Sequence, residues 1–308
     1  MILDEIFSSV FSISFAAAVV SLTVPIFLAA CGELFNELSG NLNIGIEGIV
    51  TMGGFFSYFL ARTGSLFEGI MGGLIAGAAF GLLFAFVAVS LKTNQTLGGF
   101  SVLFLGLGLS FLFYRFYLEG SKILPVQFLS VPILSQIPII GPILFQQTIF
   151  TYIFLIVLPL SAFVLAKTNI GLNIRAIGEN PEAADTAGIN VSRYRYATAI
   201  FGGAMAGLAG AAITLGVSGS FTPDIAGGRG WVALVLVIFG EWQPLKIFAG
   251  SLLFGIVNAF GFRLQVLFPG MPYQFINLLP YLFTILALTL VSKRRRGPAS
   301  LGIPYIKW

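Results

Sequence analysis

Long apolar runs separated by short polar connections constrain this chain more than any other feature of its sequence. Nine such runs lie at approximately 9–33, 44–62, 69–91, 98–118, 149–166, 196–217, 229–240, 246–267 and 273–292. Several approach the roughly 20 apolar residues that an α-helix needs to cross a hydrocarbon core of about 30 Å. The run 229–240 is too short to cross by itself, so it is either a half-helix or extends into the glycines before it. We therefore expect an all-α, polytopic transmembrane bundle of nine to ten spans over residues 1–296.

Composition supports a membrane protein of this kind. The 308 residues are 57% hydrophobic and 9% charged, whereas soluble domains are about 45–50% apolar and about 25% charged. The 37 glycines and 32 phenylalanines indicate closely packed helices, because the strands of a membrane barrel would show short alternating segments. With no histidine and a single cysteine, Cys31, the sequence predicts no metal centre, catalytic triad or structural disulfide.

The distribution of Lys and Arg predicts how the bundle is oriented. If the polar stretch 167–196 is cytoplasmic, alternation of spans also places Lys92, Lys246 and the basic run 293–296 in the cytoplasm. The N-terminus has no basic residue and lacks the positive region of a signal peptide, so it is expected to stay in the mature protein and to lie outside. The net charge of +4 is then explained by cytoplasmic loops, and no nucleic-acid partner is expected.

Two further segments have distinctive compositions. Four prolines forbid a continuous helix in the external connection 119–148, which is expected to form an ordered cap or a short amphipathic piece on the membrane surface. Residues 297–308 are expected to form a loose cytoplasmic tail.

Two pairs of similar segments raise the question of an internal repeat. MGGLIAG at 71–77 resembles FGGAMAG at 201–207, and LGGFSVLFL at 97–105 resembles GGRGWVALVL at 227–236. The two offsets nearly agree, and the members of each pair run in opposite directions in the predicted topology, which is typical of an inverted-topology repeat. The alternative is that glycine-rich helices resemble one another because close packing requires small residues. The sequence leaves both interpretations open.

The stretch 167–196 is the most polar part of an otherwise apolar chain. Asn180 is placed to cap a short helix there, Pro181 suits its first position, and Gly188 suits its termination. Two acidic residues fall in the first turn, where the helix dipole favours them. A helix of about two turns is not stable by itself in water, so we expect it to sit in the groove of a cytoplasmic partner. The residues assigned to this docking helix are Asn180, Pro181, Glu182, Ala183, Ala184, Asp185 and Gly188.

Polar residues in or beside the apolar runs are candidates for a translocation pathway. They are Asn43, Glu47, Asn94, Gln95, Thr222, Asp224 and Asn258. Glu47 is expected at the mouth of the second span and is the one acidic residue that comes near a deep position. It should share a helix face with Asn43 and either contact a substrate or tie the first two helices together. The stretch 94–96 before paired glycines predicts a re-entrant helix start or an ordinary N-cap, and 222–224 is its outer counterpart.

Four stretches together resemble one family of membrane proteins. They are GLNIRAIGENPEAADTAGI, NLNIGIEGIVTMGG, NQTLGGF and AGGRGWVALVLVIFGEWQPL, within roughly residues 25–292. They resemble the branched-chain amino acid/ribose-type permeases of ABC importers, most closely the simple-sugar or nucleoside permeases paired with basic-membrane-protein-type lipoprotein receptors. Glu182, Ala183, Ala184 and Gly188 resemble the EAA coupling motif of bacterial ABC permeases. Residues 191–194 depart from the Ile-x-Leu-Pro element that follows this motif in the maltose-type subfamily.

The resemblance implies a transport mechanism. Two permease subunits, expected to be non-identical, would form one pathway through the bacterial inner membrane, and each would seat its coupling helix in a cytoplasmic ABC ATPase. An extracellular or periplasmic binding protein would deliver a nucleoside or a related small polar solute. The ATPase would bind ATP, because this chain lacks the G-x-x-x-x-G-K-[ST] pattern, so neither enzymatic activity nor a cofactor is expected.

Other functions stay open at this point. A sugar or branched-chain amino acid permease would share the scaffold, and the resemblance implies that selectivity belongs largely to the receptor. An ion-coupled secondary transporter would need several acidic residues deep in the spans, where only Glu47 is expected. A membrane-embedded enzyme is disfavoured by the lack of histidine and the scarcity of acids.

Overall fold

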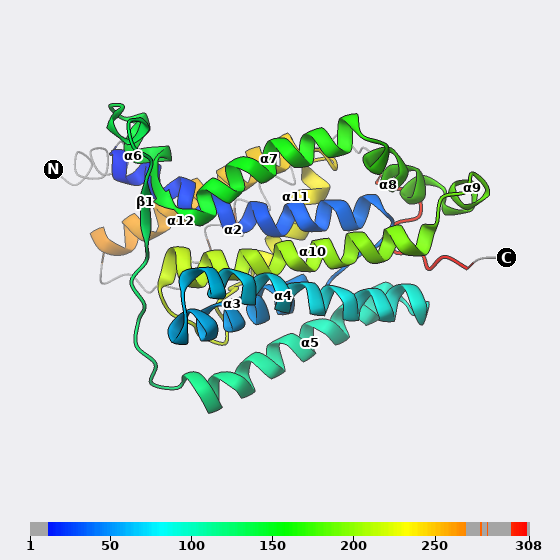
Figure 1. The fold of residues 1–308 in the computed structure, drawn as a ribbon, viewed down its shortest axis with the longest axis horizontal. Coiled ribbons are helices and arrows are strands. Elements are labelled where there is room, and N and C mark those ends of the chain that lie inside the picture. Colours follow the sequence, from blue (N-terminus) through cyan, green and yellow to red (C-terminus); the bar gives the residue numbers. More distant parts are fainter. Residues whose placement is uncertain (1–11, 269–277, 279–281, 283–296, 307–308) are drawn as a thin grey trace.

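The computed structural model describes residues 12–268, 278, 282 and 297–306 as a bundle of helices that run along its longest axis (Figure 1). The long helices of this part of the chain are α2 (Ile13–Leu38), α3 (Ile46–Thr63), α4 (Leu66–Ala85), α5 (Gln95–Phe113), α7 (Ile149–Lys167), α10 (Val191–Ile213), α11 (Arg229–Phe239) and α12 (Pro244–Leu267). Helices α4, α5 and α10 continue into the π-helical turns Phe86–Ser90, Tyr114–Leu118 and Thr214–Ser218. The all-α class is confirmed.

Six helices among the described residues are long and apolar enough to cross a membrane: Ile13–Leu38, Leu66–Ser90, Gln95–Leu118, Ile149–Lys167, Val191–Ser218 and Pro244–Leu267. Two predicted runs form shorter helices, α3 and α11. Helix α11 begins at Arg229 because Gly227 and Gly228 have φ values of 53° and 82°, so this run is a half-helix. Apart from residues 278 and 282, the predicted run 273–292 lies outside the described residues, as does the basic run 293–296. The count of nine to ten spans stays a prediction.

Short polar side chains cap the starts of half of these long helices. Ser12 and Ser65 accept hydrogen bonds from the first turns of α2 and α4, and Asn94 does the same for α5. Asn190 caps α10 by accepting from the backbone N–H of Arg193 at 2.9 Å. These side chains satisfy N–H groups that have no partner within the helix, which explains why the apolar runs start where they do.

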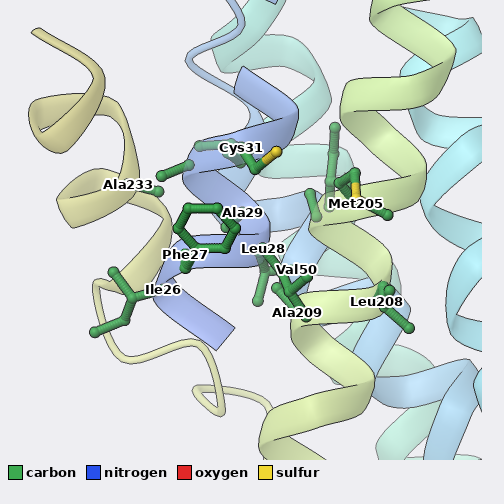
Figure 2. Close-up of a cluster of buried hydrophobic side chains, with 14 of the residues drawn as sticks. Ile26, Phe27, Leu28, Ala29, Cys31, Val50, Met205, Leu208, Ala209 and Ala233 are labelled. Atoms are coloured by element: carbon green, nitrogen blue, oxygen red, sulfur yellow. The ribbon is translucent and has the colours of Figure 1, made fainter. Parts of the chain in front are cut away.

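Helices α2 and α10 form the centre of the bundle and run antiparallel. Figure 2 shows Leu28 and Cys31 of α2 on the side that faces Met205 and Ala209 of α10, and Phe27 on the side that faces Ala233 of α11. The side chains are buried together in one apolar cluster. The two backbones approach so closely at Gly32 that an added Cβ would lie 2.7 Å from the carbonyl oxygen of Gly202. Small residues thus allow this central contact, as expected for packed membrane helices.

The two glycine motifs that suggested a repeat lie in contact with each other. Gly77 of α4 faces Gly203 and Gly207 of α10, and Gly73 faces Gly207. A Cβ on Gly77 would lie 2.7 Å from the Cα of Gly207, so each motif needs small residues because of the other. This mutual packing accounts for the likeness of 71–77 and 201–207.

The contacts between helices nevertheless show an internal symmetry, which relates different pairs of helices from those suggested by the two motifs. Helices α3 and α4 pack on α10, whereas α11 and α12 pack on α2. Exchanging α2, α3 and α4 with α10, α11 and α12 reproduces these contacts, and the helix starts are similarly offset (13 and 191, 46 and 229, 66 and 244). Because α2 and α10 are antiparallel, this pattern indicates an inverted repeat that pairs α4 with α12. Of the two interpretations that the sequence left open for 71–77 and 201–207, these contacts favour close packing.

The connections gather at the two ends of the bundle. One end carries β1 (Phe128–Ser130), the 3₁₀ turn η3 (Leu134–Gln136), α6 (Ile140–Leu144) and β2 (Gln146–Thr148), in which β1 and β2 pair antiparallel. The prolines are accommodated in this ordered cap, as predicted. The other end carries α8 (Asn169–Glu179), α9 (Pro181–Thr186) and the segment 297–306 (Figure 1). Lys92 and Lys246 lie at the same end. Ser90, close to Lys92 in the chain, forms a hydrogen bond with Tyr196 near the start of α10, and Trp242, close to Lys246, forms one with Glu37 near the end of α2.

Candidate functional site

The short helix predicted in the polar stretch is α9, and its capping is as expected. Asn180 Oδ1 accepts a hydrogen bond from the N–H of Ala183 at 3.0 Å, and Pro181 occupies the first position. Gly188 has a φ of 85°, which suits glycine. The N–H of Ile189 donates to the carbonyl of Ala184 at 3.0 Å and closes the turn that ends the helix. A six-residue helix is therefore held at both ends by local hydrogen bonds.

Helix α9 is anchored on one face and exposed on the other. Ala184 is buried against Ile177 of α8 and Val191 of α10, with Ile189 packed beside them. The opposite face is exposed and carries Glu182, Ala183, Thr186, Ala187 and Gly188. An added Cβ on Gly188 would meet nothing within 4 Å. The helix thus presents an exposed face on a fixed base.

Arg195 connects this base to the rest of the bundle. Its side chain is buried, and its guanidinium donates to the carbonyls of Ser39 at 3.1 Å and Ile303 at 2.9 Å. Ser300 adds a hydrogen bond from its own N–H to the carbonyl of Gly178 at the end of α8, at 2.8 Å. One side chain therefore joins α10, the α2–α3 connection and the C-terminal segment.

The prediction of a loose tail over 297–308 is wrong for residues 297–306. Besides the bonds to Gly178 and Arg195, Gly302 donates to the carbonyl of Gly40 at 3.1 Å. Serine 300 is buried. The prediction relied on the position of the segment at the end of the chain. Its order comes from hydrogen bonds with groups 100 or more residues away, which no local pattern shows.

The connection between α2 and α3, residues 39–45, is buried and fastened on several sides. Asn43 donates its backbone N–H to Glu33 Oε1 at 2.9 Å and caps the next turn by accepting from Gly45 N at 3.0 Å. Gln95 accepts from the N–H of Leu42 at 2.6 Å. Asn43 precedes α3, so the predicted helix face shared with Glu47 does not exist. Both Asn43 and Gln95 hold backbone in place here.

Glu47 joins the starts of two helices. It lies in the first turn of α3, and its carboxylate accepts hydrogen bonds from the backbone N–H of Gly228 at 2.7 Å and of Gly230 at 2.6 Å. Those groups belong to the N-terminus of α11, where the unpaired N–H groups and the helix dipole favour a negative charge. Glu47 therefore ties α3 to α11 and not to α2.

The remaining predicted pathway residues are dispersed. Asn94 is the N-cap of α5, accepting from Thr96 N and Leu97 N, so the ordinary N-cap is the correct alternative. Thr222 and Asp224 are exposed in the turn before α11. Asn258 donates to the carbonyl of Phe254 in its own helix at 2.8 Å. The structure does not bring these residues together.

Two buried acids of α2 were missed from the sequence. Glu33 also accepts from Asn36 Nδ2 at 3.1 Å, and Glu37 accepts from Trp242 Nε1 at 2.7 Å. Glu37 Oε1 and Asn41 Oδ1 have no hydrogen-bond partner among the described residues. The expectation of one deep acid is wrong, because the first apolar run was ended at residue 33 although α2 continues to Leu38. The signal was two glutamates four residues apart, on one helix face.

These arrangements connect distant elements of the fold through hydrogen bonds. Among the residues that the structure describes, there is no group of three or more His, Cys, Asp or Glu side chains that could hold a metal ion. The polar groups of the interior are mostly bonded to backbone N–H and carbonyl groups. The outward surface of α9 is linked through α8, residues 297–306 and Arg195 to the α2–α3 connection, which leads into Glu47 and α11.

Comparison with known proteins gives close relatives over nearly the whole chain. "Nucleoside ABC transporter permease protein NupC" of Lactococcus lactis is 36% identical, over 92% of this chain and 94% of its own length. "Guanosine ABC transporter permease protein NupQ" of Bacillus subtilis is 35% identical, over 92% and 93%. "Putative glucose ABC transporter permease protein TsgC13" of Haloferax volcanii is 35% identical, over 94% and 96%.

A solved structure and a family description agree with these relatives. The structure titled "An inward-facing conformation of a putative metal-chelate type ABC transporter" matches with a TM-score of 0.54 at 16% identity, over 91% of this chain and 88% of that one. At this identity the match shows a shared fold. The family described as "Branched-chain amino acid transport system / permease component" matches residues 15–290. The chain is therefore a member of that family of ABC importer permeases.

Proposed function

We propose that this permease subunit carries nucleosides, or closely related small polar solutes, through the membrane. The observation that carries the proposal is the identity of 35–36% over more than nine-tenths of the chain to permeases whose names specify nucleosides and guanosine. Sugars are the second candidate class, because a relative of similar identity is named for glucose. Branched-chain amino acids are a third, from the family description.

The energy for transport would come from an ABC ATPase that receives α9. In support, one face of α9 is exposed, and the buried face is fixed by Ala184 on α8 and α10. The chain itself would not hydrolyse ATP, because its sequence has no Walker A pattern. A rigid helix docked in a partner can pass on a displacement, whereas an unanchored loop would absorb it.

A second permease would complete the pathway, and α5 offers a surface for it. Helix α5 packs mainly on α3 and leaves one face exposed along its length. The residues of this face are spaced by three and four: Leu97, Ser101, Phe104, Gly108 and Phe111. Ser101 and Gly108 are small residues of the kind that let membrane helices approach. Substrate would reach this assembly from a binding protein outside.

We propose that the end with α8 and α9 faces the cytoplasm and that the cap with β1 and β2 lies outside. Support comes from the basic residues Lys92 and Lys246, which share the end with α9. Nine spans are consistent with this arrangement and place the N-terminus outside. The protein would lie in a bacterial inner membrane.

The decisive experiment is uptake into vesicles that contain this permease together with the ATPase, second permease and receptor from its gene neighbourhood. The receptor should bind nucleosides in preference to sugars or branched-chain amino acids, and uptake should stop when the Walker lysine of the ATPase is replaced. Uptake that survived this replacement and followed an ion gradient would instead identify a secondary transporter. Uptake of glucose alone would move the chain to the sugar permeases.

A further inference from the structure

A large groove opens beside the base of α9, and none of the functions above uses it. It lies between α7 and α10, with Phe35 of α2 as part of its floor, and has a volume of about 830 Å³. Residues 188–190, which follow α9, and α8 close one end of it. In Figure 1, α2 is seen between α7 and α10, and α8 and α9 lie at the end that the groove approaches.

The walls of the groove are apolar along the spans. Val157, Leu160 and Val164 line it from α7, and Phe201 and Met205 line it from α10. Helix α7 also has a strongly exposed apolar face beside the groove, with Ile156 at 64% and Phe163 at 58% exposure. The groove is therefore continuous with a surface that lipid hydrocarbon covers in a membrane.

The end beside α9 is polar and positively charged. Arg193 is exposed in the first turn of α10 and lines this end together with Asn173 and Tyr194. Asn173 Nδ2 donates to the hydroxyl of Tyr194 at 2.7 Å, which leaves the hydroxyl proton of Tyr194 available to a further acceptor. Among the described residues that line the groove there is no acidic side chain, and the one charged group is the cation of Arg193.

A molecule that matches this groove has an acidic head and a hydrocarbon tail. We propose that the groove binds one anionic phospholipid, with its phosphate at Arg193 and an acyl chain along Leu160 and Phe201. Basic pockets between membrane helices on the cytoplasmic side bind acidic lipid headgroups for the same reason. The proposal rests on the proposed function only in placing this end of the bundle in the cytoplasmic leaflet.

The position of the groove gives the lipid a role beyond solvation. Its polar end is built from Asn173 of α8 and from Gly188 and Asn190, which flank the turn from α9 into α10. A bound headgroup would connect the base of α9 to the start of α10. We expect it to stiffen the segment that carries α9, and therefore to raise the amount of substrate moved per ATP hydrolysed.

The test measures lipid binding to the purified permease complex in nanodiscs that contain phosphatidylglycerol or only phosphatidylcholine. Native mass spectrometry should find about one phosphatidylglycerol retained per copy of this chain, and none of the phosphatidylcholine. Arg193→Gln should weaken retention roughly fivefold, which corresponds to about 1 kcal/mol for one basic residue at the surface of a membrane. The control Arg175→Gln removes an exposed cation of α8 that does not line the groove, and should leave retention unchanged.

A second pair of variants separates the groove from the charge. Ala197→Phe fills the groove while keeping Arg193, and should also displace the lipid, whereas Ala166→Phe adds the same bulk on an exposed position of α7 outside the groove. Equal retention of both lipids, or equal loss in Arg175→Gln, would overturn the proposal. Loss of the ATPase or second permease in Ala197→Phe would overturn it as well, because the occupant would then be a protein. The outcome does not depend on the orientation of the protein, because both leaflets of a nanodisc have the same composition. It does not depend on the transported solute either, because no substrate is added.

Discussion

Among single residues, Glu47 has the clearest structural task, since one carboxylate serves two backbone N–H groups at the start of α11. In Glu47→Gln, an NH₂ group replaces one acceptor and faces an N–H donor. A hydrogen bond to a charged group typically contributes about 1.5–3 kcal/mol. We expect Glu47→Gln to lower the midpoint of thermal unfolding and to slow uptake.

The matched control is Glu68→Gln, which changes an exposed glutamate in the first turn of α4. Differential scanning fluorimetry in detergent should give this variant the wild-type midpoint. A Glu47→Gln variant with the wild-type unfolding midpoint and the wild-type rate of uptake would contradict the idea that the carboxylate holds α11 in place.

Gly188 has a different kind of task, which is conformational. Its φ of 85° disfavours any side chain, although an added Cβ would meet nothing nearby. Gly188→Val should therefore cost only about 1–3 kcal/mol of local strain, and should disturb the orientation of α9 more than the fold. We expect Gly188→Val, and Glu182→Ala on the exposed face, to bind the ATPase more weakly than the wild type. Expression and thermal stability should stay normal. Pull-down of the ATPase measures this, and full coupled transport in the double variant would contradict it.

How far the sequence predicts single residues depends on whether their partners are local. Asn180, Pro181 and Gly188 act on their immediate neighbours, so capping rules predicted α9 in full. Glu47 bonds groups 181 and 183 residues away, and the choice of α11 over α2 could not be read from spacing. The buried Glu33 and Glu37 were hidden by a boundary error of a few residues in α2.

Between elements, the contact of α4 with α10 depends on the absence of side chains. A Cβ on Gly77 would lie 2.7 Å from the Cα of Gly207, and backbone cannot move aside as a flexible side chain can. Gly77→Ala should force the two helices apart, with a loss of about 1–3 kcal/mol in stability. Gly108→Ala on α5, where nothing lies within 4 Å, should be neutral or slightly stabilising because alanine is the better helix former.

Thermal unfolding of the two purified variants compares these effects directly. The same loss in both would show that glycine is needed for helix flexibility and not for packing.

The sequence predicted the apolar runs and the small-residue helices well. It could not decide whether the likeness of two facing motifs came from a repeat or from packing, because packing partners and symmetry mates make the same demand on composition.

The segment 297–306 joins the end of α8, beside α9, to the connection between α2 and α3. Ser300→Ala removes a hydroxyl that donates to the end of α8, at 2.8 Å from the carbonyl oxygen of Gly178. We expect this variant to hydrolyse ATP at close to the normal rate but to move less substrate per ATP. Ser192→Ala, at an exposed position of α10, is the control. Unchanged coupling in Ser300→Ala, and in a chain that ends at residue 296, would exclude a role of this segment in transmission.

On the scale of the whole molecule, the proposed orientation can be tested with thiol labelling. The one native cysteine, Cys31, is 1% exposed and should not react. An impermeant maleimide should label Ser130→Cys, in the cap, on intact cells and Ala183→Cys, on α9, in inverted vesicles. The reverse pattern would invert the topology, and labelling of both sites from one side would refute the arrangement of the two ends.

The tethering of residues 297–306 has a consequence for how the protein is made. The guanidinium of Arg195 finds its acceptor at Ile303, which is 108 residues further along the chain. A buried arginine with unsatisfied donors is strongly disfavoured, so the start of α10 has to remain hydrated while those residues are still being translated. We therefore expect the end of the bundle with α8 and α9 to mature last, so that an ATPase that recognises it would assemble only with chains whose synthesis has passed Ile303.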